Sequence, residues 1–136
     1  MKNGRKKAGM ILAGVILVFG VLIFAMFQNM NRKTEEALAN QKNVEIDMNA
    51  VKDGTYQGSS DGGMVQVEVE VEVKGHAITQ IRLLRHDNGK GKAAEAMLDE
   101  MIKQNTDNVD AVSGATASSK TIRNAVNQAL QKGMEE

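Results

Sequence analysis

The residues Ser113-Gly114-Ala115-Thr116 have the types and spacing that best suit a chemical role in this chain. All four are small, so another molecule can approach the backbone closely, and a helix is expected to begin directly after them. The first turn of a helix presents unpaired N–H groups and a partial positive charge, which favour a bound phosphate. The Thr116 hydroxyl would be well placed for esterification by that phosphate. The residues alone leave an ordinary turn, with Gly114 at positive φ, as an equal alternative.

Other kinds of reaction centre find no support in the sequence. It contains no G-x-S-x-G nucleophile elbow, no Gly-Lys-Ser/Thr of a nucleotide-binding loop and no H-E-x-x-H zinc motif. It has no cysteine, which excludes disulfides, Cys-ligated iron–sulfur clusters and thioether-linked haem. Only two histidines are present, so we predict no metal site. A redox role would need an organic cofactor.

A hairpin is the clearest periodic feature upstream of this turn. Valine alternates with polar residues from Val65 to Val73, which predicts a half-buried strand of an antiparallel sheet. A turn at Lys74-Gly75-His76 and a second strand over about 77–85 should follow. We interpret the glutamates at positions 68, 70 and 72 as a solvated sheet face rather than an acid–base site. Residues 53–63 are rich in Gly, Ser and Asp, and we interpret them as turns and a loop.

Two amphipathic helices should complete the domain. Apolar residues recur at four-residue steps over about 92–104, and a last helix is expected over about 118–131 with Ser118 as its N-cap. Residues 104–117 should form the loop between them. We therefore predict an α+β fold with a small antiparallel sheet and two packed helices. This domain should occupy residues 51–133, with a short tail at 134–136.

The N-terminal part of the chain does not have a globular pattern. Residues 8–27 are 20 residues without a charge or a proline, and about 20 apolar residues in a helix cross a bilayer core. Four basic residues and no acidic residue precede this run. The positive-inside bias therefore places residues 1–7 in the cytoplasm and the chain after the span outside it.

A cleaved signal peptide is the alternative to a membrane anchor. We favour a retained anchor, because the apolar run is longer than that of a signal peptide and ends in Ala25-Met26-Phe27-Gln28, a poor cleavage site. Residues 28–50 are polar, and we interpret them as a stalk in which residues 31–40 can continue the membrane helix. The chain after the span carries 13 basic and 17 acidic residues, which argues against nucleic acid as a partner.

The segment Asp110-Ala-Val-Ser-Gly-Ala-Thr116-Ala-Ser118-Ser resembles the flavin-attachment signature of the FMN-binding domain family. That family includes the flavinylated peripheral subunits of the sodium-pumping quinone reductase and of the related Rnf electron-transport complex, and small surface flavoproteins of extracellular electron transfer. The resemblance covers about residues 52–132. Its further parts are the opening turn Asp53-Gly-Thr-Tyr56-Gln-Gly58, Gly62-Gly63 before the valine strand, the hairpin turn Lys74-Gly75-His-Ala-Ile78, and the helix with Ile122, Arg123 and Ala125.

The resemblance implies FMN as the cofactor, with its phosphate esterified to Thr116 by a flavin transferase that uses FAD. It also implies that Asp110 serves recognition by the transferase and that Ser113-Gly114-Ala115 shapes the loop around the phosphate. Ser118 would cap the helix, and its hydroxyl would contact the phosphate. One segment departs from the family, which often has a Glu-Thr-Pro-Gly-like stretch beside the flavin where this chain has His86-Asp87-Asn88-Gly89. We expect His86 to be a solvated loop histidine.

These observations together predict a single-pass membrane flavoprotein whose extracytoplasmic domain passes electrons from a membrane donor to an outer acceptor. The domain would be a carrier rather than an enzyme with its own substrate. Tyr56 is the only aromatic residue after the span, so a covalent tether would prevent loss of FMN. Two alternatives stay open at this point: a noncovalent FMN-binding or sensor module, and a cofactor-free surface interaction protein.

Overall fold

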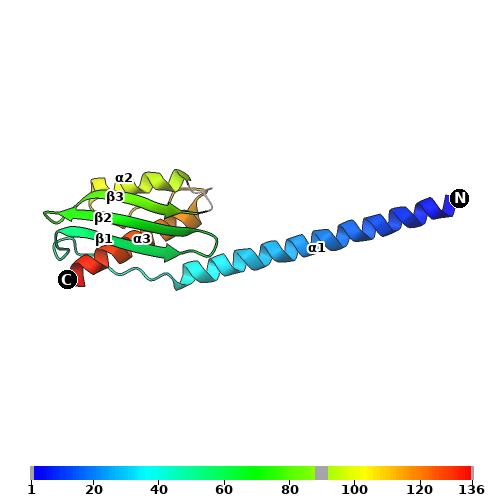
Figure 1. Ribbon diagram of the computed structural model, residues 1–136, viewed down its shortest axis with the longest axis horizontal. Coiled ribbons are helices and arrows are strands. Elements are labelled where there is room, and N and C mark those ends of the chain that lie inside the picture. The colour runs from blue at the N-terminus through cyan, green and yellow to red at the C-terminus, as the bar shows by residue number, and fades with distance from the viewer. Residues whose placement is uncertain (1, 88–91, 136) are drawn as a thin grey trace. The chain divides into compact units, whose positions relative to one another are not determined.

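The computed structural model describes residues 2–87 and 92–135. The chain divides into two compact units, residues 1–33 and residues 34–136. Helix α1 (Lys2–Asn40) makes up the first unit and ends in the second. Figure 1 labels the elements of the second unit, which is the folded domain.

Helix α1 runs without interruption through the predicted span and on to Asn40, so the predicted continuation of the helix beyond the apolar run is confirmed. Its large apolar side chains from Met10 to Phe27 are all exposed. By length and composition it is able to cross a membrane, and a signal sequence near the N-terminus satisfies the same criteria. Among the described residues, no other helix does so.

Three antiparallel strands form the sheet of the domain, in the order β1-β2-β3. They are β1 (Gly54–Asp61), β2 (Gln66–Lys74) and β3 (Ala77–His86). The predicted hairpin is confirmed as β2 and β3, and the buried valines of β2 alternate with its charged residues. The hairpin turn has positive φ at both Gly75 and His76, the conformation that two-residue hairpin turns of type I′ require.

The prediction of turns and a loop over 53–63 was wrong, because most of this segment is strand β1. Its inward positions are Tyr56, Gly58 and Ser60, so only one of the three carries a large apolar side chain and no valine-like alternation marks the strand. The strand is held by its pairing with β2 and by close packing of α3. A Cβ at Gly58 would lie 2.0 Å from the carbonyl oxygen of Ala125, so glycine lets the helix backbone lie against the strand.

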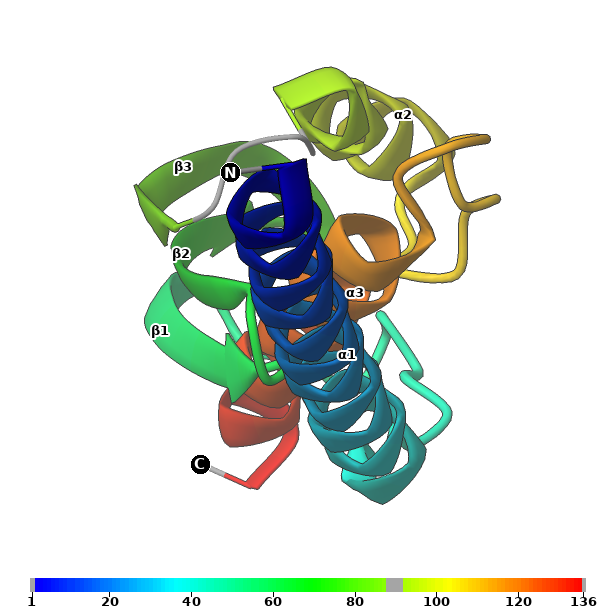
Figure 2. The same cartoon turned by 90° about the vertical axis from the view of Figure 1, so that its right-hand side faces the viewer.

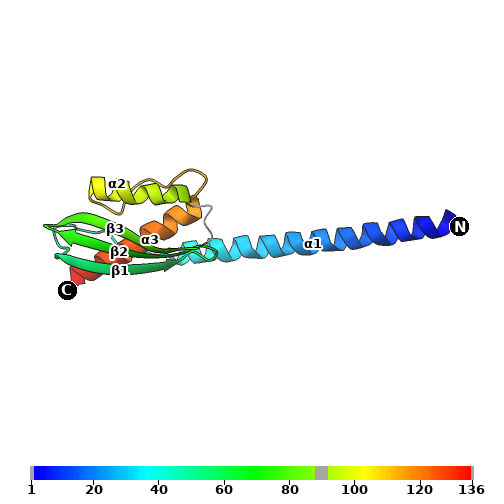
Figure 3. The same cartoon turned by 45° about the horizontal axis from the view of Figure 1, so that its top comes forward.

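One face of the sheet is covered by helices. They are the short 3-10 helix η1 (Lys92–Glu95), α2 (Ala96–Gln104) and α3 (Thr116–Glu135), and Figures 2 and 3 show α2 and α3 on the same side of the sheet. Helix α3 packs on β1 and β2, and α2 packs on β3. The core between the layers contains the β2 valines together with Met101, Ile122 and Leu130. The predicted α+β fold is therefore confirmed.

The last helix differs from its predicted bounds at both ends. It begins at Thr116 rather than Ser118 and continues past Gln131 to Glu135. The extension at the C-terminal end has a packing reason, because Gly133 is buried against Val51 and Tyr56. At the N-terminal end, Ser118 lies inside the first turn, so its predicted role as N-cap was wrong.

Residues 41–48, which we expected to be part of a stalk, pack against α3. The side chain of Asn127 pairs with both backbone groups of Val44, accepting from its N–H at 3.1 Å and donating to its carbonyl oxygen at 2.8 Å. Asn124 donates to the carbonyl oxygen of Lys42 at 3.1 Å. Polar residues of α3 thus hold the backbone of this segment, and two of its apolar side chains pack against the core of the domain.

Candidate functional site

Thr116 is the first residue of α3, and it is exposed. The turn before it is closed by a hydrogen bond from the N–H of Ala115 to the carbonyl oxygen of Val112 at 3.0 Å. Gly114 is the third residue of this turn and has a φ of 80°, which a type II turn requires at that position. A Cβ at Gly114 would meet no heavy atom within 4 Å. Backbone conformation, not crowding, is therefore what favours glycine here.

The start of α3 presents hydrogen-bond donors beside the Thr116 hydroxyl. The N–H of Ser119 donates to the carbonyl oxygen of Ala115 at 2.9 Å, and the three N–H groups before it precede the intrahelical ladder. The first turn contains no acidic residue, and Lys120, one turn after Thr116, is exposed. A positively polarised helix end, whose first N–H groups lie outside the intrahelical ladder and whose first turn has no acidic residue, suits a phosphate.

Two buried serines tie the first turn of α3 to its surroundings. The Ser119 hydroxyl accepts a hydrogen bond from the N–H of Val112 at 3.0 Å, which holds the loop against the helix that follows it. The Ser118 hydroxyl instead lies 3.2 Å from Nε2 of His86. The sequence does not indicate this contact, because no pattern relates the end of a strand to a helix more than thirty residues later.

His86 is the last residue of β3, and only 5% of its side chain is exposed. The expectation of a solvated loop histidine was therefore wrong, because β3 reaches His86 and the imidazole lies between η1 and α3. Its Nδ1 lies 3.3 Å from Oε1 of Glu95. An ionised carboxylate only accepts, so Nδ1 carries a hydrogen and, in the neutral ring, Nε2 accepts from Ser118. Residues 88 and 89 of the departing segment lie outside the described residues.

Asp110 is exposed in the loop between α2 and α3. Within the described residues, no hydrogen bond or ion pair joins it to Thr116 or to the Ser113-Gly114-Ala115 turn. Its predicted role in recognition by another protein therefore stays a prediction. Its exposure is compatible with that role.

Tyr56 is buried in the core, and its hydroxyl donates to the carbonyl oxygen of Lys52 at 2.8 Å. It is the only aromatic residue after position 27. Because this ring is covered, it offers no surface on which a flat ligand could stack.

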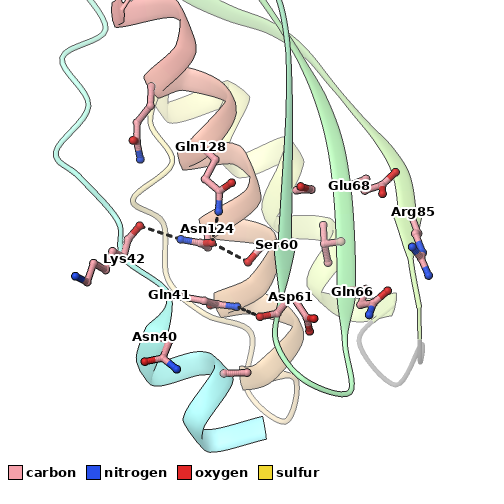
Figure 4. A pocket seen from close by; sticks show the side chains of 14 residues that line it. Asn40, Gln41, Lys42, Ser60, Asp61, Gln66, Glu68, Arg85, Asn124 and Gln128 are labelled. Atoms are coloured by element: carbon pink, nitrogen blue, oxygen red, sulfur yellow. Dashed lines mark hydrogen bonds between the residues drawn. The ribbon is translucent and has the colours of Figure 1, made fainter. Parts of the chain in front are cut away.

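A polar hollow of about 920 Å³ lies elsewhere on the domain, between residues 37–42, β1 and α3. Figure 4 shows Ser60 and Asn124 inside it, joined by a hydrogen bond of 2.7 Å. Its described lining does not include Thr116 or the other predicted site residues. The hollow is thus separate from the turn at Thr116, and Asn124 in its lining holds the segment that follows α1.

The described domain is therefore a helix-covered antiparallel sheet with an exposed threonine at a phosphate-compatible helix start. A model of the FMN-binding domain family matches residues 62–131. The chain belongs to the FMN-binding domain family. A comparison with curated proteins found no match.

The described residues fit one end of FMN in particular. The phosphate end suits the donors at the start of α3, where the exposed Thr116 hydroxyl and the glycine turn leave the backbone accessible. For the ring end, the described part of residues 34–135 supplies no exposed aromatic side chain, because Tyr56 is buried. The described residues therefore suit the phosphate end of FMN better than its ring.

Proposed function

We propose that FMN is joined covalently to Thr116 through a phosphodiester. The observation that supports this proposal most directly is an exposed threonine hydroxyl at the first position of α3, after a glycine turn, in a member of the FMN-binding domain family. A flavin transferase using FAD would catalyse the attachment. A bond forms between the Thr116 oxygen and the FMN phosphorus, the pyrophosphate bond of FAD breaks, AMP leaves, and the threonine proton is released to solvent.

A covalent bond accounts for the retention of the flavin in this domain. Stacking on aromatic side chains is a common source of affinity for flat rings, and the described domain has no exposed aromatic residue. Without such contacts, a dissociable flavin outside the cell would be diluted away. Attachment through the phosphate makes retention independent of how tightly the ring is held.

Mass spectrometry tests the attachment site. The full chain co-expressed with a flavin transferase should gain the mass of FMN less one water, and trypsin should place that mass on the peptide of residues 104–120. Thr116→Ala should abolish the gain, whereas Thr55→Ala, at an exposed threonine of β1, should keep it. A flavin that denaturation releases would instead establish noncovalent binding. A colourless chain made with transferase and FAD would favour a cofactor-free surface protein.

Recognition by the transferase can be tested separately. Asp110→Asn keeps the size of an exposed side chain and removes its charge. If Asp110 serves recognition, this variant should be flavinylated several-fold more slowly while it unfolds at the same urea concentration as the wild type. An unchanged rate of flavin incorporation would contradict this role.

We further propose that α1 anchors the domain outside the membrane, with residues 1–7 in the cytoplasm. Support comes from the exposed apolar surface of α1 and from the basic residues that precede it. The chain has no cysteine, so single cysteines can report topology. A membrane-impermeant maleimide should label Gln80→Cys in intact cells and label Lys6→Cys only after lysis. The opposite pattern, or a mature protein that lacks α1, would overturn the anchor.

The anchored flavin would carry electrons between a membrane donor and an outer acceptor. FMN supplies the redox chemistry when bound, and the protein supplies its position and electrostatic surroundings. In membranes that contain the flavinylated chain, a quinol or NADH donor system should bleach the flavin absorbance, and an impermeant oxidant should restore it. Bleaching that is equal in membranes with the Thr116→Ala variant would argue against electron carriage by this flavin.

A further inference from the structure

The structure contains a partly buried chain of polar side chains at the start of α3 that the proposed function does not use. It consists of Glu95 in η1, His86 at the end of β3 and Ser118 in the first turn of α3. We propose that these three residues form a relay that hydrogen-bonds the phosphodiester on Thr116 and fixes its position. The inference rests on the proposed covalent flavin and adds a positioning role for His86, which acts through Ser118.

The relay ends in the first turn of α3, which also carries Thr116. Glu95 Oε1 lies 3.3 Å from Nδ1 of His86, and Nε2 of the same ring lies 3.2 Å from the Ser118 oxygen. Ser118 is the third residue of α3, two after Thr116. The Cα–Cβ bonds of a helix tilt toward its N-terminus, so a side chain at the third position leans toward an anion bound at the helix start.

The direction of the hydrogen bonds depends on whether a phosphate is present. With Nδ1 donating to Glu95, Nε2 of a singly protonated ring accepts from the Ser118 hydroxyl. A phosphodiester oxygen only accepts, so Ser118 must turn its hydrogen toward the phosphate and accept one from Nε2. His86 then takes up one proton from water and becomes an imidazolium between two acceptors. Such a ring would donate to Glu95 through Nδ1 and to Ser118 through Nε2.

Few other charges compete for His86 in the described residues. Glu95 faces it from η1, Ser118 is the polar group from α3, and the neighbouring residue on β2 is Val67. The flanking charges Arg85 and Asp87 pair with each other at 2.6 Å. On flavinylation, the phosphate should therefore be the main new charge that interacts with the His86 ring.

Phosphorus NMR offers a direct test, because a phosphodiester does not itself titrate near neutral pH whereas histidine does. The flavinylated full chain, lipid-free in a maltoside detergent that contains no phosphorus, should show one phosphodiester resonance. We expect its position to change with an inflection between about pH 5 and 8. His86→Gln should remove the inflection, and the matched control His76→Gln, in the turn at the opposite end of β3, should keep it.

Each result decides for or against the relay. A resonance that is constant with pH, an inflection that survives in His86→Gln, or one that disappears in His76→Gln would overturn the proposal. Absence of any protein-bound phosphodiester signal from the wild type after denaturing removal of free flavin would instead refute the proposed attachment. The two failures are therefore distinguishable.

A second measurement covers the case in which His86→Gln does not fold or is not flavinylated. The ring nitrogens of His86 in the wild-type chain can be observed by long-range proton–nitrogen correlation at one pH near neutrality. The relay predicts a hydrogen on both nitrogens in the flavinylated protein and on Nδ1 alone in the flavin-free protein. Ser118→Ala should keep the flavin-free pattern even after flavinylation. Identical patterns in the two wild-type samples would overturn the proposal.

Discussion

Replacement of Asn127 by alanine should weaken the attachment of the segment that follows α1 to the domain. Asn127 is fully buried on α3, and its side chain makes two hydrogen bonds to the backbone of Val44. It also donates to the buried carboxylate of Asp107 at 2.8 Å. Arg123 is only a distant partner of that carboxylate, because its Nε lies 3.9 Å from Oδ2 of Asp107. Asn127→Ala therefore leaves one buried charge and two backbone groups without their amide partner.

The size of the effect follows from these contacts. Each neutral hydrogen bond contributes about 1 kcal/mol to stability, and a bond to a charged acceptor contributes about 2 kcal/mol. The higher helix propensity of alanine offsets about 0.6 kcal/mol of this loss of stability. The free energy of unfolding should therefore fall by about 3.5 kcal/mol. With a slope of about 1.5 kcal/mol per M in urea, the midpoint should fall by about 2 M.

Tyr56 provides the measurement, because it is the only tyrosine, it is buried, and the chain has no tryptophan. Its fluorescence during urea unfolding of the flavin-free full chain in detergent reports on the domain alone. Gln131→Ala is the matched control, since it removes one half-buried partner of Asn127 and should cost less than about 1 kcal/mol. A loss below about 1 kcal/mol in Asn127→Ala, or unchanged hydrogen exchange at the Val44 N–H, would refute the reasoning.

Three other predictions test the fold. Gly58→Ala places a Cβ 2.0 Å from the α3 backbone and should lower the free energy of unfolding in urea by about 3 kcal/mol. In the control Gly75→Ala, the Cβ meets no atom within 4 Å, so only the strain of its φ of 58° should reduce stability, by about 1 kcal/mol. Equal losses of stability in the two variants would contradict this packing. Asn105→Ala removes both hydrogen bonds that hold the hairpin turn to the end of α2 and should lower the melting temperature by about 4–8 °C; no decrease would contradict it. The hydrogen bond from Thr79, followed by Lys74, holds the pKa of Glu72 below its ordinary 4.5. The stability that Glu72 contributes is therefore present at neutral pH and lost as the pH falls through the lowered value. Glu72→Gln should flatten the acid side of a plot of urea midpoint against pH, and an unchanged slope would contradict the assignment.

The parts of the fold with a repeating apolar pattern could be predicted from the sequence. Alternating valines identify β2, and four-residue apolar steps identify α2 and most of α3, because burial of one face imposes these periods. Strand β1 could not be found in this way. Two of its inward residues are Gly58 and Ser60, and its stability comes from pairing with β2 and from close packing of α3.

The candidate site was only partly predictable. The turn before Thr116 could be predicted from its small residues and from Gly114. In the structure, Gly114 has the expected positive φ. Ser118 was expected to cap the helix, but tertiary structure places it against His86 instead. Contacts of this kind, like that between Asn127 and Val44, join residues far apart in the chain without any sequence period. They emerge only when the sheet and helices are packed together.

The bond between FMN and Thr116 is the central claim, and the intact mass of the full chain tests it most directly. The chain should be produced with and without a flavin transferase, with FAD available in both cases, and analysed after denaturation. We predict a gain of FMN less one water only with the transferase, and no gain in Thr116→Ala. An unmodified wild-type mass in the presence of an active transferase, or a modified Thr116→Ala, would contradict it.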